Sequence, residues 1–419
     1  MKTVLFIVHD YPPIRTAGTE RVLKFAQHLP AFGYRPLILT TARYGSLPDD
    51  PANGIYRAGD LVHTLFSPWR RRSRTLPAEA QVQIATLASH SLFGRLRDQW
   101  MAPDTKLGWL LPAVRLGQDL IAQHRPALLF SSSPPETAHL IARRLSRSSG
   151  LPWVADLRDG WLFEPPNPAL RQAGWRRWWE GRMERDVVGQ AAAVVAATDP
   201  ITADLRRRYP HAAAITITNG YDEAEFAGLA RQRRPDGRFL LVYTGSLAAS
   251  RAGTSPDAFF QALARHRQEQ PSTPLCVRIV GNISAAEQAA AQALGDMVEF
   301  LPAVSRRQAH QHQLDADALL LITAPGQRSV ATLKLFEYIR AGAPILALAD
   351  DNAAAAIVQA DDLGITVPPD DPAAIAAALA SLMQRCRGEN RWPGFAAAQA
   401  RYERRQLTAQ LAACFDTLR

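Results

Sequence analysis

Lys334 and Glu337 are oppositely charged residues three positions apart, in a short segment whose apolar spacing is typical of a helix. Thr332 stands where a helix N-cap is expected, and Leu333 follows as the first helical residue. A helix start presents unpaired backbone N–H groups and the positive end of the helix dipole, and Lys334 adds a full positive charge beside them. This combination predicts a binding site for a phosphate.

Residues three apart on a helix share one face, so the ammonium group of Lys334 and the carboxylate of Glu337 can meet the same ligand. A cation holds a pyrophosphate, whereas a carboxylate accepts hydrogen bonds from sugar hydroxyls. The pair therefore indicates a nucleotide-sugar site. The alternative is an ordinary surface ion pair on an amphipathic helix, and the spacing alone leaves both interpretations open.

Further polar and glycine residues follow two apolar runs of the second half. Gly245 and Ser246 come after residues 239–243, with Arg251 a few positions on as a bidentate phosphate donor, and Gly281 and Asn282 come after residues 276–280. Parallel strands present their carboxyl ends at one edge of a sheet, so we expect these residues beside the charged helix.

In the first half, Asp156, Arg158 and Asp159 lie directly between an apolar run and Trp161. A carboxylate that faces a cleft can orient or deprotonate a hydroxyl, which predicts a catalytic group here. The spacing does not rank the two aspartates. The alternative is that Arg158 pairs with one of them and ties the loop down.

Two other strand ends carry weaker signals. Gly18 lies in the loop after the first apolar run, where it allows close approach to a ligand, and Thr19 is expected to cap the helix that follows. The alternative for Gly18 is a simple turn glycine. Ser131, Ser132 and Ser133 end another run, and their hydroxyls either position a sugar or stabilise a turn.

Apolar runs alternate with helical patterns along the whole chain, which predicts an α/β fold of the doubly wound type. The expected strands cover residues 3–8, 37–40, 127–130, 153–155, 193–197, 214–218, 239–243, 276–280, 298–301, 318–323, 345–348 and 364–367. The irregular segment 43–110 is expected to cover the edge of the first sheet rather than to extend it. Residues 371–382 and 395–418 are expected to be helices.

A chain of 419 residues is longer than one hydrophobic core usually organises. We therefore expect two Rossmann-like domains, at 1–221 and 222–394, and we expect residues 395–419 to pack back on the first domain. Three widely spaced cysteines indicate a reducing compartment, without disulfides or a metal site. No apolar run reaches the roughly 18 to 20 residues that cross a bilayer.

The net charge of +9 favours acidic partners. Nucleic acid is not expected, because no motif of a nucleic-acid-binding fold accompanies the charge. Arginines interleave with tryptophan at residues 69–74 and 175–179, a composition typical of contacts with an anionic membrane surface. The alternative is solvated arginine beside core tryptophan.

Five short motifs, in this order over nearly the whole chain, resemble a bacterial retaining glycosyltransferase of family four, of the surface-polysaccharide type with the GT-B fold. They are DYPP at 10–13 with Gly18, SPP at 133–135 leading to ADLRDGW at 155–161, NGYD at 219–222, YTGSL at 243–247, and KLFEY at 334–338 with AGAP at 341–344.

The resemblance implies two Rossmann-like domains facing a central cleft, with the acceptor held by the first and a nucleotide-diphosphate-sugar donor by the second. It implies transfer with retention to a polysaccharide or lipid-linked acceptor, without a metal or another cofactor. Glu337 would hold the donor ribose, and Arg251 and Lys334 would neutralise the pyrophosphate. The enzyme is expected in the cytoplasm, including the inner face of the plasma membrane.

The chain departs from the family at several positions. Ser329 stands where many members have the first of two glutamates, no histidine follows Ala155, and the paired glycines of the first loop are reduced to Ala17 and Gly18. Two alternatives therefore stay open. One is a sugar-nucleotide epimerase or hydrolase on the same fold, and the other is a saccharide or membrane binder without transferase activity.

Overall fold

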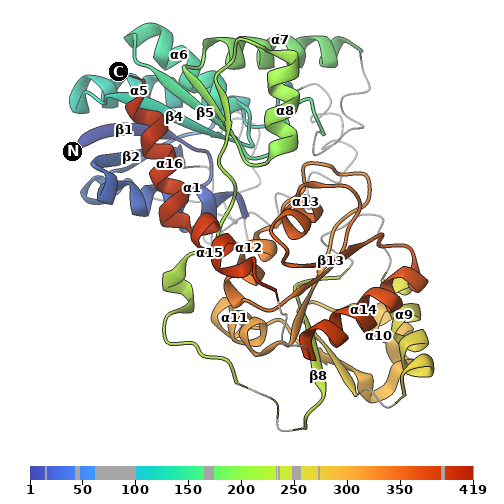
Figure 1. The fold of residues 1–419 in the computed structure, drawn as a ribbon. Coiled ribbons are helices and arrows are strands. Elements are labelled where there is room, and N and C mark those ends of the chain that lie inside the picture. The colour runs from blue at the N-terminus through green and yellow to red at the C-terminus, as the bar shows by residue number, and fades with distance from the viewer. Residues whose placement is uncertain are drawn as a thin grey trace. The chain divides into compact units, whose positions relative to one another are not determined.

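The computed structural model describes residues 1–14, 17–42, 48–61, 101–164, 174–232, 234, 236–247, 256–271, 274–387 and 392–418. The chain divides into two compact units, one of Met1–Thr218 with Leu407–Arg419 and the other of Asn219–Gln406. Each unit contains one all-parallel sheet with helices between its strands (Figure 1). The predicted class, an α/β fold of two Rossmann-like domains, is confirmed.

The first unit is built on a seven-stranded sheet in the order β3-β2-β1-β4-β5-β6-β7. Its strands are β1 (Lys2–Ile7), β2 (Tyr34–Thr41), β3 (Ile55–Ala58), β4 (Leu128–Ser133), β5 (Trp153–Leu157), β6 (Ala193–Ala196) and β7 (Ala214–Thr216). The order reverses between β1 and β4. Ligands of such sheets bind where the strand order reverses, outside the carboxyl ends of the strands.

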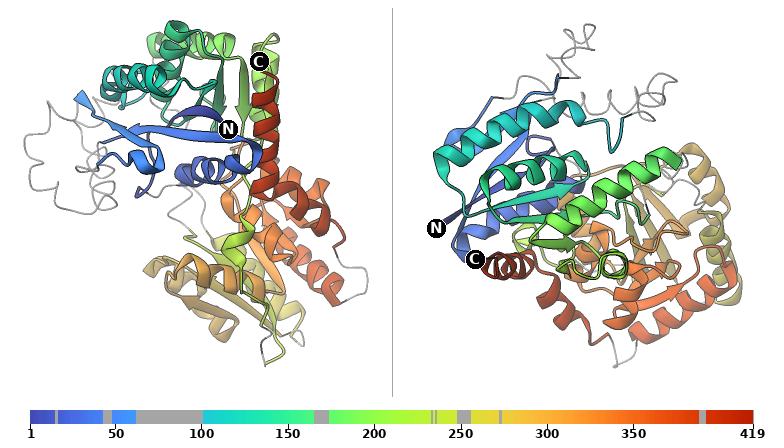
Figure 2. Two further views of the ribbon diagram at one scale, coloured as in Figure 1. Left: turned by 90° about the vertical axis from the view of Figure 1, so that its left-hand side faces the viewer. Right: turned by 90° about the horizontal axis from the view of Figure 1, so that it is seen from above.

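Helices cover both faces of this sheet, as Figure 2 shows in its left view. They are α1 (Ala17–His28), α5 (Leu110–His124), α6 (Thr137–Ser149), α7 (Gly174–Gln190), α8 (Asp199–Arg208) and the final helix α16 (Arg404–Asp416), with short 3-10 helices at Leu29–Phe32, Pro51–Asn53 and Leu107–Trp109. Alternate residues of β1 serve the two faces. Leu5 packs in the core with α5 and α6, whereas Phe6 packs in the core with α1 and α16.

Strand β3 corrects the prediction for segment 43–110. Residues 62–100 of this segment lie outside the described part of the chain, but Ile55–Ala58 extends the sheet rather than covering its edge. It pairs with β2 from Ile38 opposite Ile55 to Thr41 opposite Ala58. The strand is short and lies at the edge, so three of its four residues are only partly buried, and it lacks the apolar run of the central strands.

The second unit has a six-stranded sheet in the order β10-β9-β8-β11-β12-β13. Its strands are β8 (Phe239–Thr244), β9 (Leu275–Val280), β10 (Val298–Leu301), β11 (Ala318–Ile322), β12 (Ile345–Leu348) and β13 (Gly364–Val367). Its helices are α9 (Asp257–Glu269), α10 (Ala285–Ala291), α11 (Arg306–Asp315), α12 (Leu333–Ala341), α13 (Ala353–Ala360), α14 (Pro372–Arg387) and α15 (Phe395–Tyr402), with 3-10 helices at Glu223–Phe226 and Gln292–Met297. Here the strand order reverses between β8 and β11.

The predicted single helix at 395–418 is wrong, because the chain forms α15 and α16 with a break at Glu403. The backbone on either side of the break pairs with Tyr221, whose N–H donates to the carbonyl of Tyr402 and whose carbonyl accepts from the N–H of Arg404. These bonds replace helical ones at that point. Residues from Leu407 onward belong to the first unit, and α15 belongs to the second.

Within the parts of the chain that the structure describes, no helix is both long and apolar enough to cross a membrane.

Candidate functional site

Lys334 lies at the carboxyl edge of the second sheet, in the first turn of α12. Its Nζ donates a hydrogen bond of 3.1 Å to the hydroxyl of Tyr243 and lies 4.5 Å from the centroid of that ring. Tyr243 is fully buried at the end of β8 and donates in turn to the carbonyl of Ser246, over 2.9 Å. The end of β8 therefore fixes where the ammonium group of Lys334 lies.

Two glycines allow this close packing. Gly245 has a φ of 121°, and a Cβ added to it would lie 2.3 Å from Nζ of Lys334. A Cβ added to Gly281 would lie 2.2 Å from the carbonyl oxygen of Gly245. The turns after β8 and β9 thus lie against each other, with Lys334 on the first of them. The structure brings these three predicted residues together.

Thr332 occupies the N-cap position of α12, but its side chain makes no capping hydrogen bond. Its Oγ1 is buried and has no partner among the described residues. The predicted N-cap position of Thr332 is therefore confirmed, although its hydroxyl does not cap the helix. Leu333 is the first helical residue, and the first-turn N–H groups of α12 lack a side-chain acceptor from Thr332.

Glu337 lies one turn further along α12 and meets three side chains of α11. Its carboxylate accepts from Nη2 of Arg306 at 3.2 Å and from Nε2 of Gln313 at 3.1 Å, and Nε2 of His310 lies 3.7 Å away. Desolvation alone would raise the pKa of Glu337, but the contact with His310 and the charge of Arg306 hold that pKa below its usual value. Glu337 is thus an ionised acceptor, and 15% of its side chain is exposed.

Sequence reasoning missed the α11 residues. Arg306, His310 and Gln313 are spaced i, i+4 and i+7, which places them on one helix face and could have identified them. The ring of His310 stacks on Phe226 at 4.2 Å, and Nε2 of Gln313 also donates to Oγ1 of Thr244 at 3.0 Å. Through Gln313, the end of β8 and the carboxylate of Glu337 are held by the same side chain.

Three further residues were predicted at this edge, and the structure describes two of them. Asn282 is exposed in the turn after Gly281, and Ser246 contributes its carbonyl to Tyr243. Arg251 lies outside the described residues. No group of three or more His, Cys, Asp or Glu residues in the described part of the chain is arranged to hold a metal ion.

In the first unit, Asp156 is buried in β5 rather than facing a cleft, which corrects the prediction for it. Its side chain is 0% exposed and pairs with Arg21 of α1, at 2.8 Å between Oδ1 and Nη2. Ser132 donates to its other oxygen at 2.7 Å. The carboxylate of Asp156 is therefore occupied by groups of the protein itself. Arg21 also donates to the carbonyls of Ile217 and Thr218, so the pair joins α1, β5 and the end of the first unit.

Arg158 follows β5 and contacts the backbone rather than either aspartate. Its guanidinium donates to the carbonyls of Ser133, at 2.8 Å, and Pro134. It also fills the space beside Gly18, where an added Cβ would overlap the guanidinium. Gly18 is therefore a packing glycine inside α1, and Thr19 lies within that helix instead of capping it. Arg158 makes no ion pair within 4 Å to either aspartate among the described residues, but its charge acts on Asp159: desolvation raises the pKa of Asp159, and Arg158 opposes that rise.

Asp159 is the exposed carboxylate of this segment. Its side chain makes no hydrogen bond or ion pair within the described residues, although the charge of Arg158 acts on it. The structure thus separates the two aspartates that the spacing left unranked. One is enclosed by an ion pair, and the other is accessible at the carboxyl edge of the first sheet.

The hydroxyls of Ser131 and Ser132 at the end of β4 bond to buried side chains, which favours the structural interpretation for these two serines. Ser131 accepts from the indole N–H of Trp153 and bonds to His139, each at 2.7 Å. Burial lowers the pKa of His139 to about 3, so this histidine is neutral. These hydroxyls satisfy buried polar groups of the core.

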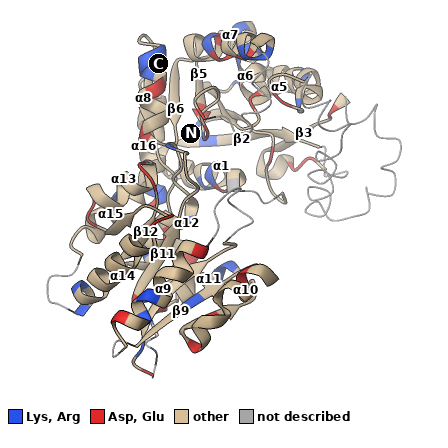
Figure 3. Ribbon diagram, turned by 90° about the vertical axis from the view of Figure 1, so that its right-hand side faces the viewer, with Lys and Arg blue, Asp and Glu red and all other residues tan. Residues whose placement is uncertain are grey.

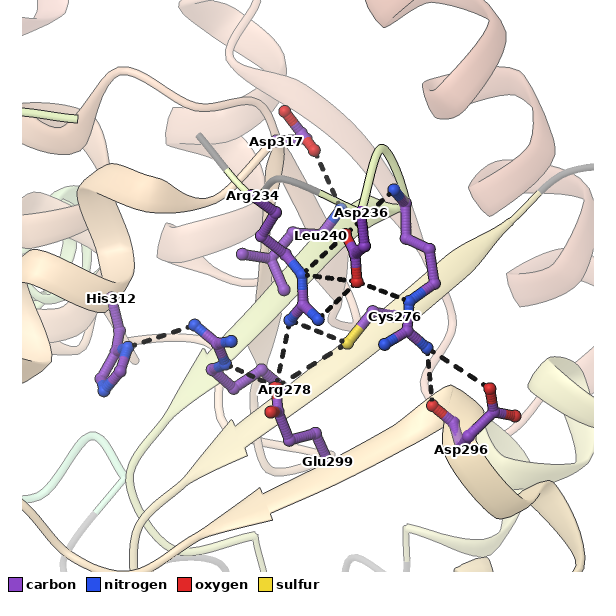
Figure 4. Close-up of polar contacts among 10 residues, drawn as sticks. Arg234, Asp236, Leu240, Cys276, Arg278, Asp296, Glu299, His312 and Asp317 are labelled. Carbon is purple, nitrogen blue, oxygen red and sulfur yellow. Dashed lines mark hydrogen bonds and ion pairs between the residues drawn. The ribbon is translucent and has the colours of Figure 1, made fainter. Parts of the chain in front are cut away.

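Another polar cluster lies at the amino ends of β8 and β11, at the opposite edge of the second sheet (Figure 4). A cavity of about 550 Å³ opens there and is lined by Arg231, Arg234, Arg238 and Trp392 among others. Three of its arginines are paired with carboxylates. Arg231 pairs with Asp317, and Arg234 and Arg238 share the carboxylate of Asp236.

Solved structures with the same architecture align with nearly all of the chain. Sucrose-phosphate synthase from Thermosynechococcus elongatus has 14% identity and a TM-score of 0.62, over 100% of this chain and 99% of that one. HepE from Anabaena in complex with UDP has 15% identity and a TM-score of 0.60, over 100% of both chains. The lipopolysaccharide outer core galactosyltransferase WaaB has 14% identity and a TM-score of 0.61, over 99% and 100%. At these identities the likeness shows the fold, which is that of GT-B glycosyltransferases.

Two family models place the chain more closely. Residues 16–220 match the glycosyl transferase 4-like domain, and residues 238–385 match the glycosyl transferases of group 1. Together the two matches span well over half of the chain and, with the fold, identify it as a glycosyltransferase of the GT-B type. No curated protein matches it. The predicted class of enzyme is confirmed, whereas retention, family four and the surface-polysaccharide type stay predictions.

Proposed function

We propose that the protein transfers a sugar from a nucleotide-diphosphate donor to a polysaccharide or lipid-linked saccharide acceptor, with retention of the anomeric configuration. One observation carries the donor half of this proposal. Lys334 is held by Tyr243 and the Gly245 turn at the carboxyl edge of the second sheet, beside the start of α12. A positive group at a helix start and a strand end suits a diphosphate.

The chemistry follows from the charges around that edge. As the sugar leaves, negative charge develops on the nucleoside diphosphate, and the ammonium group of Lys334 stabilises it. The carboxylate of Glu337, kept ionised by Arg306 and His310, accepts hydrogen bonds from the ribose hydroxyls. Arg251 is a further proposed donor to the pyrophosphate, as the family resemblance implies. Retention likewise rests on that resemblance.

The acceptor half rests on the first unit. Asp159 is the accessible carboxylate after β5, and we assign it the orientation of the acceptor hydroxyl. The acceptor class is proposed from the family resemblance and from the likeness to WaaB, whose name describes a lipopolysaccharide galactosyltransferase. A lipid-linked acceptor places the reaction at a membrane, so we propose a cytoplasmic enzyme that works peripherally at the inner face of the plasma membrane.

A thermal-shift panel with UDP, GDP and ADP tests the donor site. We expect one nucleotide to raise the midpoint of unfolding in the wild type and to have little effect on Lys334→Ala. Lys24→Ala removes the same charge from α1 and serves as the control. A panel without any shift would contradict the proposal and favour a saccharide or membrane binder.

Product analysis tests the reaction itself. Proton NMR of a turnover mixture reports the anomeric configuration of the donor and of the product, and retention predicts the same anomer in both. Free nucleotide that forms at the same rate without acceptor would instead indicate the alternative, an epimerase or hydrolase. A product of the opposite anomeric configuration would contradict retention but would not contradict the proposed donor site.

A further inference from the structure

Helix α7 turns charged side chains inward and aromatic ones outward, the reverse of an ordinary surface helix. Trp175, Trp178 and Trp179 are 46%, 65% and 47% exposed, whereas Arg176 and Glu180 are buried. Exposed tryptophan costs solubility, and three such residues within two turns form an apolar patch of the kind that marks an interaction site.

The inward charges are satisfied, so the orientation of the helix is fixed. Arg176 pairs with Glu180 at 2.6 Å and donates to the carbonyl of Pro103 at 3.0 Å. Glu184 pairs with Arg208 and accepts from the hydroxyl of Tyr209 at 2.8 Å. Rotation of α7 to bury its tryptophans would break these buried pairs and leave uncompensated buried charges.

Exposed arginines surround the tryptophans. They are Arg177, Arg182 and Arg185 on α7 and Arg144 and Arg147 on α6, and Figure 3 shows the basic stretches along α7. The acidic residues of α7 do not balance them, because Glu180 and Glu184 are buried and Asp186 pairs with Arg143 at 2.9 Å. Helix α6 contains no acidic residue. The face is therefore both aromatic and strongly positive.

A groove beside the tryptophans adds apolar depth. It has a volume of about 600 Å³ and is lined by Leu111, Leu140, Trp179 and Met183, with Arg144 and Arg147 among the residues at its wall. Leu111 is itself 58% exposed. Apolar side chains within reach of several guanidinium groups match the boundary between acyl chains and phosphate headgroups.

We propose that this aromatic–basic face, formed by Trp175, Trp178 and Trp179 with the five exposed arginines named above, docks on an anionic lipid bilayer. The indole rings enter the headgroup region, and the arginines pair with lipid phosphates. This face would bring the enzyme to the membrane that contains a lipid-linked acceptor. Only this link to the acceptor rests on the proposed function. The unbalanced positive charge favours anionic lipid over a neutral saccharide or a second copy of the chain.

Co-sedimentation with vesicles tests this face on the full chain. We expect the protein to sediment with vesicles of phosphatidylglycerol and phosphatidylcholine at low salt, and to stay in solution with phosphatidylcholine alone. Binding should weaken steeply as salt is raised, since lipid charge attracts the arginines. Sedimentation with neither kind of vesicle would overturn the proposal.

Two variants locate the contact. With anionic vesicles, the triple variant Trp175→Ser/Trp178→Ser/Trp179→Ser should sediment no more than the wild type does with neutral vesicles. The double variant Arg177→Glu/Arg182→Glu should bind anionic vesicles at least about 25-fold more weakly than the wild type. The double variant Arg35→Glu/Arg265→Glu makes the same change in net charge elsewhere and should bind as the wild type does. Unchanged sedimentation of either face variant would overturn the proposal.

The donor site supplies an independent readout. The face variants should keep the wild-type thermal shift with nucleotide, which shows that they are folded and separates this test from that of the proposed function. A tryptophan-dependent dimer, or tryptophan-dependent retention on immobilised polysaccharide without vesicle binding, would assign the face to another partner and overturn the proposal.

Discussion

A Cβ atom added to Gly245 would lie 2.3 Å from Nζ of Lys334, so the glycine leaves the space that the ammonium group uses. The end of β8 can therefore hold the ammonium group of Lys334 in this place only if position 245 has no side chain. Because Nζ is the tip of a flexible side chain, substitution displaces Lys334 rather than preventing folding.

Gly245→Ala should weaken nucleotide binding by about tenfold or more, since it moves a charge away from the diphosphate. The left-handed φ of 121° adds a cost of about 1 to 3 kcal/mol to folding. Gly237→Ala also places a side chain at a positive φ, of 69°, but with nothing within 4 Å of the added Cβ, and it serves as the control. Equal nucleotide affinity in both variants, measured by calorimetry, would disprove the role of Gly245.

Glu337 predicts a pH dependence of stability. Its pKa is held below the ordinary 4.5, so ionisation of Glu337 stabilises the folded unit at a pH above that value, and this contribution is lost as the pH falls through the lowered pKa. Glu337→Gln removes this contribution. Urea unfolding at neutral pH and at about pH 3 to 4 should show a smaller acid-side loss in the variant than in the wild type. An equal loss of stability at acid pH in the wild type and in Glu337→Gln would show that ionised Glu337 does not stabilise the fold.

The buried pair of Arg21 and Asp156 predicts a defect in stability. Arg21→Met leaves the carboxylate of Asp156 without its cation and should lower the free energy of unfolding of the first unit by about 3 to 5 kcal/mol. Adding Asp156→Leu to Arg21→Met should restore part of the lost free energy of unfolding, because the uncompensated charge is removed. Denaturant unfolding measures both. A double variant as unstable as the sum of two independent losses would argue against the pair.

Asp159 and Asp156 should separate in their effects on turnover. Asp159→Asn removes an exposed carboxylate and should lower turnover by about 100-fold or more with unchanged unfolding, because the acceptor hydroxyl loses its partner. Asp156→Asn should instead lower stability. A transfer assay with a thermal melt on each variant decides between them, and full activity of Asp159→Asn would exclude its proposed role.

The central strands were predictable from the sequence because parallel strands buried on both faces are continuous apolar runs, as in Leu319 to Ile322 of β11. The edge strand β3 lacks such a run and was missed. The break at Glu403 was also missed, since it depends on backbone pairing with Tyr221, far away in the sequence. Local patterns do not contain partners of this kind.

The same limit applies to the site. Lys334 and the glycines were found because strand ends and a helix start are local signals. The partner of Asp156 is 135 positions away, so the burial of its carboxylate could not be read from the spacing. His310 and Gln313 carried a helical spacing, but only the fold turns that face toward Glu337.

The affinity for a nucleoside diphosphate tests the account most directly. Calorimetric titration of UDP, or of whichever diphosphate the thermal panel selects, should give at least about tenfold weaker binding to Lys334→Ala than to the wild type and to Lys24→Ala. Equal dissociation constants for all three proteins would show that Lys334 does not hold the diphosphate and would contradict the donor site proposed at the edge of the second sheet.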